Sequence, residues 1–336
     1  MAPLIANTIG LVVLLTSLGL MDASPGLAQG PAKAGAANYP NKPVRLIVPF
    51  PAGGGTDIVA RIIAREMSDS MGTPIVVDNR GGAAGIIASE IAGKSTPDGY
   101  TLLFGNTATN ATHAAIYRKL PYDPIKDFAA ISLAAFSPYV MSVNPSVPAK
   151  SVKEFVALAK AKPGQLNFGS GGNGSVPHLA AALFNYLAGI NVVHVPYKGG
   201  AAHLPALVAG EVQVNFSSAV QVMPLVKAGK LRALAVTGTS RLPAAPELPT
   251  VAEAGVPGYE FGIWWGFLAP AGTPRTTVNH LYGEVVKALR SQDVKEKFGR
   301  AGVDIVGNKP DEFAAVIRRD VALWKKIAAA AGIRLD

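Results

Sequence analysis

Three consecutive glycines follow an apolar stretch near the start of the chain, in Val44-Arg-Leu-Ile-Val-Pro-Phe-Pro-Ala-Gly-Gly-Gly-Thr-Asp57. The apolar part predicts a buried strand and residues 58–71 predict a helix, so the glycines form the turn between them. Glycine lets the backbone approach a ligand closely, and the first N–H groups of a helix have no partner within it. The segment therefore predicts a site for an anion.

The motifs that bind nucleotide phosphates are absent from this loop. No Gly-Lys-Ser or Gly-Lys-Thr follows it, and the third glycine of the dinucleotide fingerprint is missing. A tight strand–helix turn capped by Thr56 or Asp57 is the alternative to an anion site.

A second segment repeats the arrangement in the other half of the chain. Leu166-Asn-Phe-Gly-Ser-Gly-Gly-Asn-Gly-Ser175 predicts a strand and a glycine-rich turn, followed by a helix over residues 177–187. If each half forms a lobe, two helix N-termini would face one cleft and suit a ligand with one or two carboxylates. A third loop, Asn79 to Gly85, is interpreted as a structural turn, with a further binding wall as the alternative.

Side chains that could perform catalysis do not form a known motif. The chain lacks a Gly-x-Ser-x-Gly elbow, its five histidines lack metal-binding spacing, and it contains no cysteine. His178, in the first turn of the second loop's helix, is the best functional candidate, although a packed or capping histidine is the favoured interpretation. Lys198 would either contact an anion or lie exposed in a turn. We expect no enzyme activity, no metal and no cofactor.

The composition and length indicate the class of protein to which these loops belong. Of 336 residues, 49% are hydrophobic and 16% charged, which predicts a folded protein, and the length favours two domains. The net charge of +9 comes from dispersed lysines and arginines, so we expect no nucleic-acid partner. Strand-like and helix-like segments alternate, which predicts an α/β fold with largely parallel sheets. Trp264 and Trp265 lie on one predicted strand, so one should face the core and the other the cleft.

The first residues predict export from the cytoplasm. Residues 9–20 are almost entirely apolar but too short to span a bilayer, and Gly26-Leu27-Ala28 suits a signal peptidase. We predict a signal peptide over residues 1–28, a flexible lead-in over 29–38, and a periplasmic location. A buried N-terminal helix is the alternative.

The segment Tyr39–Asp57 resembles the start of the Bug family, the substrate-binding proteins of tripartite tricarboxylate transporters. Other segments match in family order and extend the resemblance over residues 39–336: Pro97–Leu103, Phe168–Ser175, Pro177–Leu179, Val195–Gly199, Gly229–Thr237, Leu248–Gly255, Trp265-Gly266 and Ala269–Pro274.

The resemblance implies a periplasmic-binding-protein fold of the second type, with two α/β lobes joined by two crossovers. Lobe 1 would comprise residues 39–138 plus 262–336, and lobe 2 residues 139–261. The crossovers would lie near Phe136–Val140 and Tyr259–Trp264.

The resemblance also implies that a small mono-, di- or aromatic carboxylate is held largely by backbone N–H groups and waters from the two glycine loops. The ligand-binding residues that it implies are Ala52, Gly53, Gly54, Thr56, Asp57, Asn106, Thr107, Ser137, Ser170, Gly171, Gly174 and Ser175. Asp57 would receive an amino group if the ligand has one, and would otherwise be a cap.

The partners implied are a carboxylate and the membrane permease subunits of the transporter, with the binding protein acting as a monomer. A ligand-dependent sensor and a secreted hydrolase remain as alternatives. Two departures from the family pattern border the expected cleft, at Ala201–Pro205 and at Ser217-Ser218, and they bear on which carboxylate is bound.

Overall fold

The computed structural model describes residues 39–199, 202–243, 245–331 and 334. All of them lie in one of the two units into which the chain divides, Asn38–Asp336. The predicted signal peptide and lead-in, residues 1–38, lie outside the described residues. Within the described ranges, no helix combines the length and the apolar character that crossing a bilayer requires.

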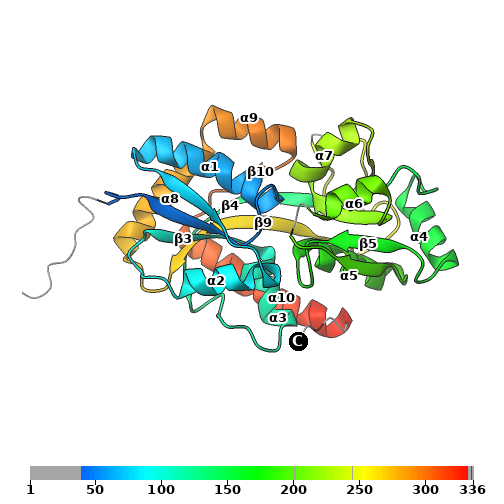
Figure 1. Ribbon diagram of the computed structural model, residues 1–336, viewed down its shortest axis with the longest axis horizontal. Coiled ribbons are helices and arrows are strands. Elements are labelled where there is room, and N and C mark those ends of the chain that lie inside the picture. Colours follow the sequence, from blue (N-terminus) through cyan, green and yellow to red (C-terminus); the bar gives the residue numbers. More distant parts are fainter. Residues whose placement is uncertain (1–38, 200–201, 244, 332–333, 335–336) are drawn as a thin grey trace, which may run out of the picture. The chain divides into compact units, whose positions relative to one another are not determined.

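Strands and helices alternate along the described chain (Figure 1). The strands are β1 (Val44–Val48), β2 (Ile75–Asn79), β3 (Thr101–Asn106), β4 (Phe128–Val143), β5 (Asn167–Ser170), β6 (Val193–Pro196), β7 (Val214–Ser218), β8 (Arg232–Val236), β9 (Gly262–Pro270) and β10 (Asp304–Ile305). The helices are α1 (Gly55–Met71), α2 (Ile86–Gly93), α3 (His113–Ile116), α4 (Val152–Ala161), α5 (Val176–Ala188), α6 (His203–Ala209), α7 (Ala219–Lys227), α8 (Arg275–Leu289), α9 (Gln292–Ala301) and α10 (Pro310–Ala331).

Two groups of strands share the long strand β4, in the order β2-β1-β3-β9-β4-β7-β5-β6. The first part of β4 pairs with β9 as far as Pro138, opposite Gly262. From Tyr139 onward β4 pairs with β7 instead, and β8 joins it at Val140. In Figure 1, β4 and β9 connect the group that contains β3 with the group that contains β5. One continuous strand therefore belongs to both groups and changes partners at residues 138–139.

The sheets are less parallel than the sequence predicts. β1 pairs in parallel with β2 and β3, and β5 with β6 and β7, but every described pairing of β4 and β9 is antiparallel. β4 also begins at Phe128, although its pattern predicts a strand only from Tyr139. Residues 128–138 are rich in alanine, which disfavours strands, so pairing with β9 overrides local preference there.

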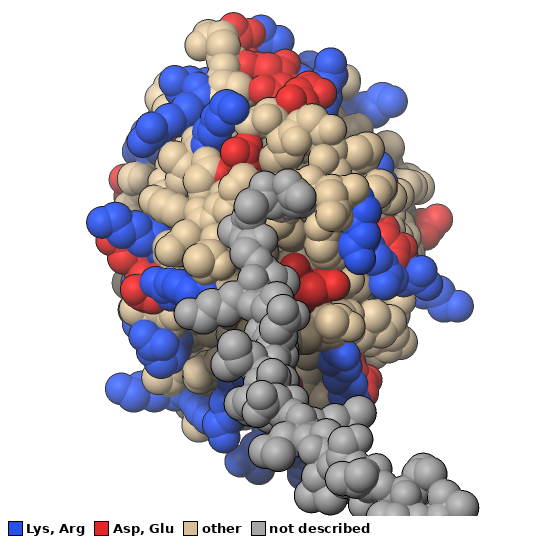
Figure 2. Space-filling view, turned by 90° about the vertical axis from the view of Figure 1, so that its left-hand side faces the viewer, with Lys and Arg blue, Asp and Glu red and all other residues tan. Residues whose placement is uncertain are grey.

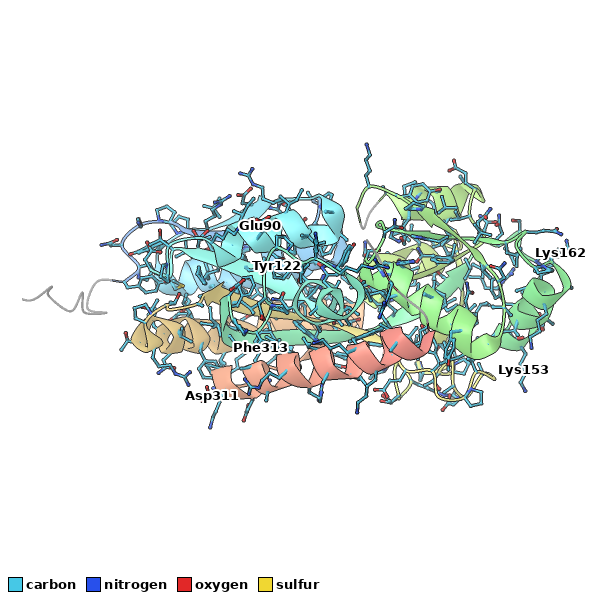
Figure 3. The ribbon with its side chains drawn as sticks, turned by 90° about the horizontal axis from the view of Figure 1, so that it is seen from below. Glu90, Tyr122, Lys153, Lys162, Asp311 and Phe313 are labelled. Atoms are coloured by element: carbon cyan, nitrogen blue, oxygen red, sulfur yellow. The ribbon has the colours of Figure 1, made fainter. Side chains whose placement is uncertain are left out.

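Helices cover the strands with apolar faces. α10 packs on β4, and Phe313 of that helix is fully buried and meets the ring of Trp264 edge-on (Figure 3). α1 packs against α8. On the face seen in Figure 2, lysine and arginine side chains are interspersed with acidic and uncharged residues. The buried strands thus form a rigid support for the loops at their ends.

Candidate functional site

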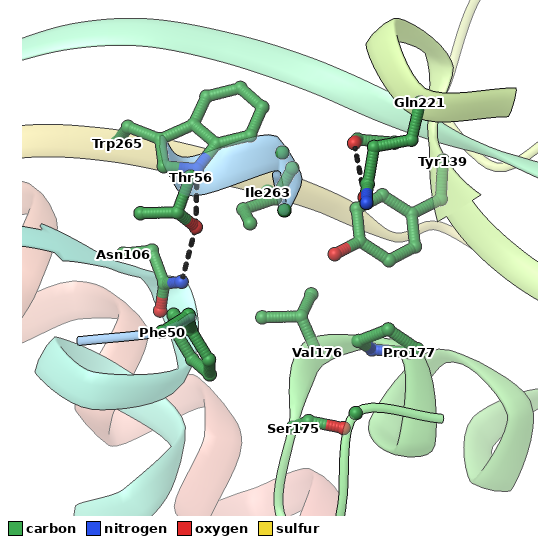
Figure 4. A pocket seen from close by; sticks show the side chains of 14 residues that line it. Phe50, Thr56, Asn106, Tyr139, Ser175, Val176, Pro177, Gln221, Ile263 and Trp265 are labelled. Atoms are coloured by element: carbon green, nitrogen blue, oxygen red, sulfur yellow. Dashed lines mark hydrogen bonds between the residues drawn. The ribbon is translucent and has the colours of Figure 1, made fainter. Parts of the chain in front are cut away.

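A cavity lies where α1, α5 and α7 begin, between the two groups of strands (Figure 4). The space within it that a water molecule can occupy is about 30 Å³. Its lining consists of Phe50, Gly54, Gly55, Thr56, Asn106, Tyr139, Gly171, Ser175, Val176, Pro177, Ser218, Gln221, Ile263 and Trp265. Since no lysine, arginine, histidine or acidic residue is among them, backbone and neutral polar groups must meet any charge on a ligand.

The first of the three helix starts is that of α1. Its first backbone bond runs from the N–H of Ile58 to the carbonyl of Gly54, at 3.0 Å. The N–H groups of Gly55, Thr56 and Asp57 therefore have no acceptor within the helix. Gly54, the N-cap residue, has no side chain to accept them, so the turn offers several donors at the cavity wall.

The other two starts come from the second group of strands. In α5 the first backbone bond runs from Leu179 to Ser175, which leaves the N–H of Val176 without an acceptor in the helix. In α7 the N-cap is Ser218, and its side chain does not accept a backbone N–H of the helix. Each helix start carries about half a positive charge, so the cavity favours an anion although it contains no cationic side chain.

Thr56, in α1, is held in position by two hydrogen-bond donors, one on β3 and one on β9. Its Oγ1 accepts hydrogen bonds from Asn106 Nδ2 at 3.2 Å and from Trp265 Nε1 at 3.0 Å. Asn106 Oδ1 in turn accepts from the N–H groups of Ala108 and Thr109, which fixes the amide. With both acceptor positions of Thr56 filled, its hydroxyl hydrogen remains to donate to a ligand.

Asp57 is bonded to its own loop rather than aimed at the cavity. Its Oδ2 accepts from the N–H of Gly53 at 2.9 Å, and its Oδ1 pairs with Arg61 at 2.8 Å. Burial alone would raise the pKa of this carboxyl, but hydrogen bonds from Arg61, Gly53 and Asn79, with the charge of Arg61, hold it below its usual value. Asp57 therefore stays ionised and closes the glycine turn. The N–H of Gly53 is occupied by the same bond.

The second glycine loop rests on stacked rings. The rings of His178 and His194 lie 4.1 Å apart, and Phe168 stacks on His194 at 4.8 Å. Ser170 Oγ lies 2.6 Å from His194 Nε2, and the N–H of Gly174 donates to His178 Nδ1 at 3.1 Å. Burial lowers the pKa of His178 to about 4; burial and the neighbouring His178 lower that of His194 to about 3. Both rings are neutral at pH 7 and support the loop.

Five of the twelve residues predicted for the site line the cavity, namely Gly54, Thr56, Asn106, Gly171 and Ser175. The other seven lie outside its lining: Ala52, Gly53, Asp57, Thr107, Ser137, Ser170 and Gly174. The side chains of several of these residues form hydrogen bonds with other parts of the protein. Thr107 Oγ1 accepts the N–H of Trp264 at 2.9 Å, and Ser137 Oγ donates to the carbonyl of Gly302 at 3.1 Å.

The two tryptophans face opposite sides of β9, as period 2 predicts. Trp265 lines the cavity, whereas Trp264 Nε1 donates to Asp320 Oδ2 of α10 at 2.8 Å. The third glycine loop, with Gly81–Gly85, borders a larger hollow of about 720 Å³. This hollow adjoins the cavity, because Phe50 and Gly171 line both.

Tyr139, Ser218 and Gln221 also line the cavity, although the sequence did not predict them as site residues. β4–β7 pairing places Tyr139 directly opposite Ser218. Tyr139 is far from Ser218 and Gln221 in the chain and shares no motif with them. Only the departure from the family pattern at Ser217-Ser218 pointed to this region.

The two sides of the cavity approach one another closely around its mouth. A Cβ atom added at Gly55 would lie 2.5 Å from Ser218 Oγ, which is closer than atoms can approach without moving. His113 Nε2 lies 3.2 Å from the carbonyl oxygen of Gly174, and Tyr117 donates to the carbonyl of Asn173 at 3.1 Å. The two sides of the cavity are thus in contact with each other.

Comparison with protein families gives one match. A model described as the tripartite tricarboxylate transporter family receptor matches residues 59–333. Among curated relatives, a protein from the tcbD-tcbE intergenic region of Pseudomonas sp. strain P51 is 38% identical over 86% of each chain. Protein BugT of Bordetella pertussis is 34% identical over 96% of this chain and 98% of its own.

Solved structures match over nearly the whole described chain. An R. palustris protein with adipate is 38% identical with a TM-score of 0.85, covering 88% of this chain and 99% of that one. MatC from Rhodopseudomonas palustris with bound malate is 33% identical with a TM-score of 0.83, covering 86% and 99%. Periplasmic binding protein BugD is 31% identical with a TM-score of 0.85, covering 88% and 99%. The fold is therefore the two-lobed α/β fold of these binding proteins.

Proposed function

The chain belongs to the receptor family of tripartite tricarboxylate transporters, and from this membership we propose that it captures a small carboxylate in the cavity where α1, α5 and α7 begin. The relatives with adipate and malate support a carboxylate as the ligand class. We propose that Gly54, Thr56, Asn106, Gly171 and Ser175 contact it, while the seven predicted residues outside the lining hold the loops in shape.

The observation that carries this proposal is the convergence of three helix starts on a cavity without charged side chains. A carboxylate accepts several hydrogen bonds at once, which matches a set of open N–H groups. Each bond from a neutral donor to a charged oxygen contributes about 1.5–3 kcal/mol. A cation would be repelled by the same partial charges.

We propose that the two lobes are residues 39–138 plus 262–336 and residues 139–261, and that they close over the ligand. The change of partners in β4 between Pro138 and Tyr139 supports this division. β4 and β9 would bend there, since these strands connect the two groups. The contacts around the cavity mouth would form on closure.

We propose further that the protein acts in the periplasm after removal of residues 1–28 and delivers its ligand, as a monomer, to the permease subunits of the transporter. It would release the ligand unchanged. Ser175 Oγ donates to the carbonyl of Gly172 at 2.7 Å and His178 Nδ1 accepts from the N–H of Gly174, so both side chains are bonded to their own loop.

Thermal unfolding with a panel of carboxylates tests this function. A carboxylate at about 100 times its Kd should stabilise the fold by about 2.7 kcal/mol and raise the unfolding temperature measurably. The matched controls are the corresponding neutral amides, for example adipamide beside adipate, because they keep the carbon skeleton and remove the charge. Equal shifts from acids and amides, or no shift from any carboxylate, would contradict the proposal.

A further inference from the structure

Tyr139 has a hydroxyl group that the protein itself does not use. The residue is only 4% exposed and lines the cavity, and its hydroxyl points into the open space (Figure 4). Among the described residues this hydroxyl has no hydrogen-bond partner. Because a hydroxyl that opens into a cavity is bonded by water or by a ligand, this group is available for a bond that a ligand makes.

The backbone of Tyr139 holds the ring firmly in this position. Its N–H donates to Thr237 Oγ1 at 2.6 Å, and its carbonyl accepts from the N–H of Thr237 at 2.8 Å. The ring also packs against Phe261, with centroids 5.8 Å apart. The hydroxyl is therefore presented in a fixed direction, at the point where β4 changes partners.

The backbone of Tyr139 lies beside the start of α7. Strand pairing places Tyr139 opposite Ser218, the N-cap residue of α7. Ser218 Oγ donates to Gln221 Oε1 at 3.1 Å and caps no backbone N–H of the helix. The N–H groups of Ala219 and Val220 therefore have no acceptor within α7. A phenolic O–H and the start of a helix therefore both belong to the lining of this cavity.

Both groups require an acceptor. Burial raises the pKa of Tyr139 well above its ordinary value, so the phenol keeps its proton and can donate it. The helix start favours an acceptor with negative charge. Thr56, at the start of α1, and Asn106, at the end of β3, lie across the cavity from Tyr139 (Figure 4).

We propose that the Tyr139 hydroxyl forms a second binding point, across the cavity from Thr56, which selects carboxylates that carry another oxygen acceptor away from the first carboxylate. This inference rests on the proposed function and narrows its ligand class. A second carboxylate and a hydroxyl both provide such an acceptor. A simple monocarboxylate leaves the phenol unpaired, and binds more weakly for that reason.

Tyr139→Phe removes the hydroxyl alone and leaves every bond within the protein in place. Tyr259→Phe is the matched control, because Tyr259 is equally buried but donates to the carbonyl of Ala180 at 3.0 Å and lies outside the cavity lining. The control should lower stability and leave ligand selectivity unchanged. Tyr139→Phe should leave stability unchanged and alter ligand selectivity.

Calorimetric titration of the wild-type chain with dicarboxylates from malonate to suberate identifies the tightest one. Three ligands of that carbon number are then compared: the dicarboxylate, the ω-hydroxy acid and the monocarboxylate. Tyr139→Phe should weaken the dicarboxylate about 10- to 100-fold and the hydroxy acid about 3- to 10-fold, because bonds to charged acceptors are stronger. The monocarboxylate should change by less than about twofold.

Two results would overturn the inference. One is that Tyr139→Phe loses affinity equally for all three ligands, or for none of them. The other is that the wild-type chain binds monocarboxylates but neither dicarboxylates nor hydroxy acids. Both leave carboxylate binding itself intact. A wild-type chain that binds none of these acids in titration or in the thermal panel contradicts the proposed function instead.

Discussion

Asp57 lies next to the residues of α1 that line the cavity, and its carboxylate is bonded to Gly53 and Arg61. Its side chain is 5% exposed, whereas that of Arg61 is half exposed. The bond to Gly53 closes the glycine turn, so Asp57 acts on the site by shaping the loop. A ligand amino group, which the resemblance left open as a partner, would have to compete with both bonds.

Asp57→Asn should lower the free energy of unfolding by about 1–2 kcal/mol at pH 7, since a charged acceptor is lost and the Arg61 pair is partly screened. A carboxyl whose pKa is lower in the folded chain stabilises the fold while ionised. The difference between wild type and variant should therefore be complete above about pH 4 and disappear as pH falls through the lowered pKa. Urea unfolding of both proteins at pH 7 and at pH 2–3 measures it. A difference that does not depend on pH would contradict this account.

At the scale of elements, the site is formed by helix starts brought face to face. α1 begins in one group of strands and α7 in the other, and Gly55 lies so close to Ser218 that an added Cβ would meet its Oγ at 2.5 Å. Gly55 has no positive φ, so the backbone there accepts alanine. Because Gly55 has no side chain, the starts of α1 and α7 can lie this close together.

Gly55→Ala should weaken carboxylate binding about tenfold or more, because Ser218 must move or the lobes must stay apart. The stability of the fold should be unchanged or slightly higher, since alanine favours helices. Gly283→Ala is the matched control: this glycine lies in α8 with nothing within 4 Å of an added Cβ. Titration with the tightest carboxylate measures the affinities. Equal affinities of the two variants would show that the approach of α1 and α7 is not needed for binding.

The arrangement of the helices and strands explains which parts of the site could be predicted from the sequence. Gly54 and Ser175 could be found because a strand, a glycine turn and a helix start are local signals. Tyr139 and Ser218 could not, because they meet only through antiparallel pairing of β4 with β7. The antiparallel centre of the sheet was missed for the same reason, since the alanine-rich first part of β4 has no strand pattern of its own.

At the scale of the whole described unit, the structure has the features that a receptor of this family needs. In the proposed closure, the strand that both groups share would provide the bending point, and the glycine loops at the strand ends would provide the two sides of the cavity. Neutral walls with open N–H groups suit a receptor that must release its ligand, because they hold a carboxylate without a buried ion pair. Ligand affinity then depends on closure as well as on contacts.

The central claim is that the starts of the helices, and no cationic side chain, hold the carboxylate. A crystal structure of the chain with its tightest carboxylate tests this most directly. We predict carboxylate oxygens within about 3 Å of backbone N–H groups at the start of α1, with the Thr56 hydroxyl donating to one of them. A carboxylate paired with a lysine or arginine, or bound outside the cavity of α1, α5 and α7, would contradict the account.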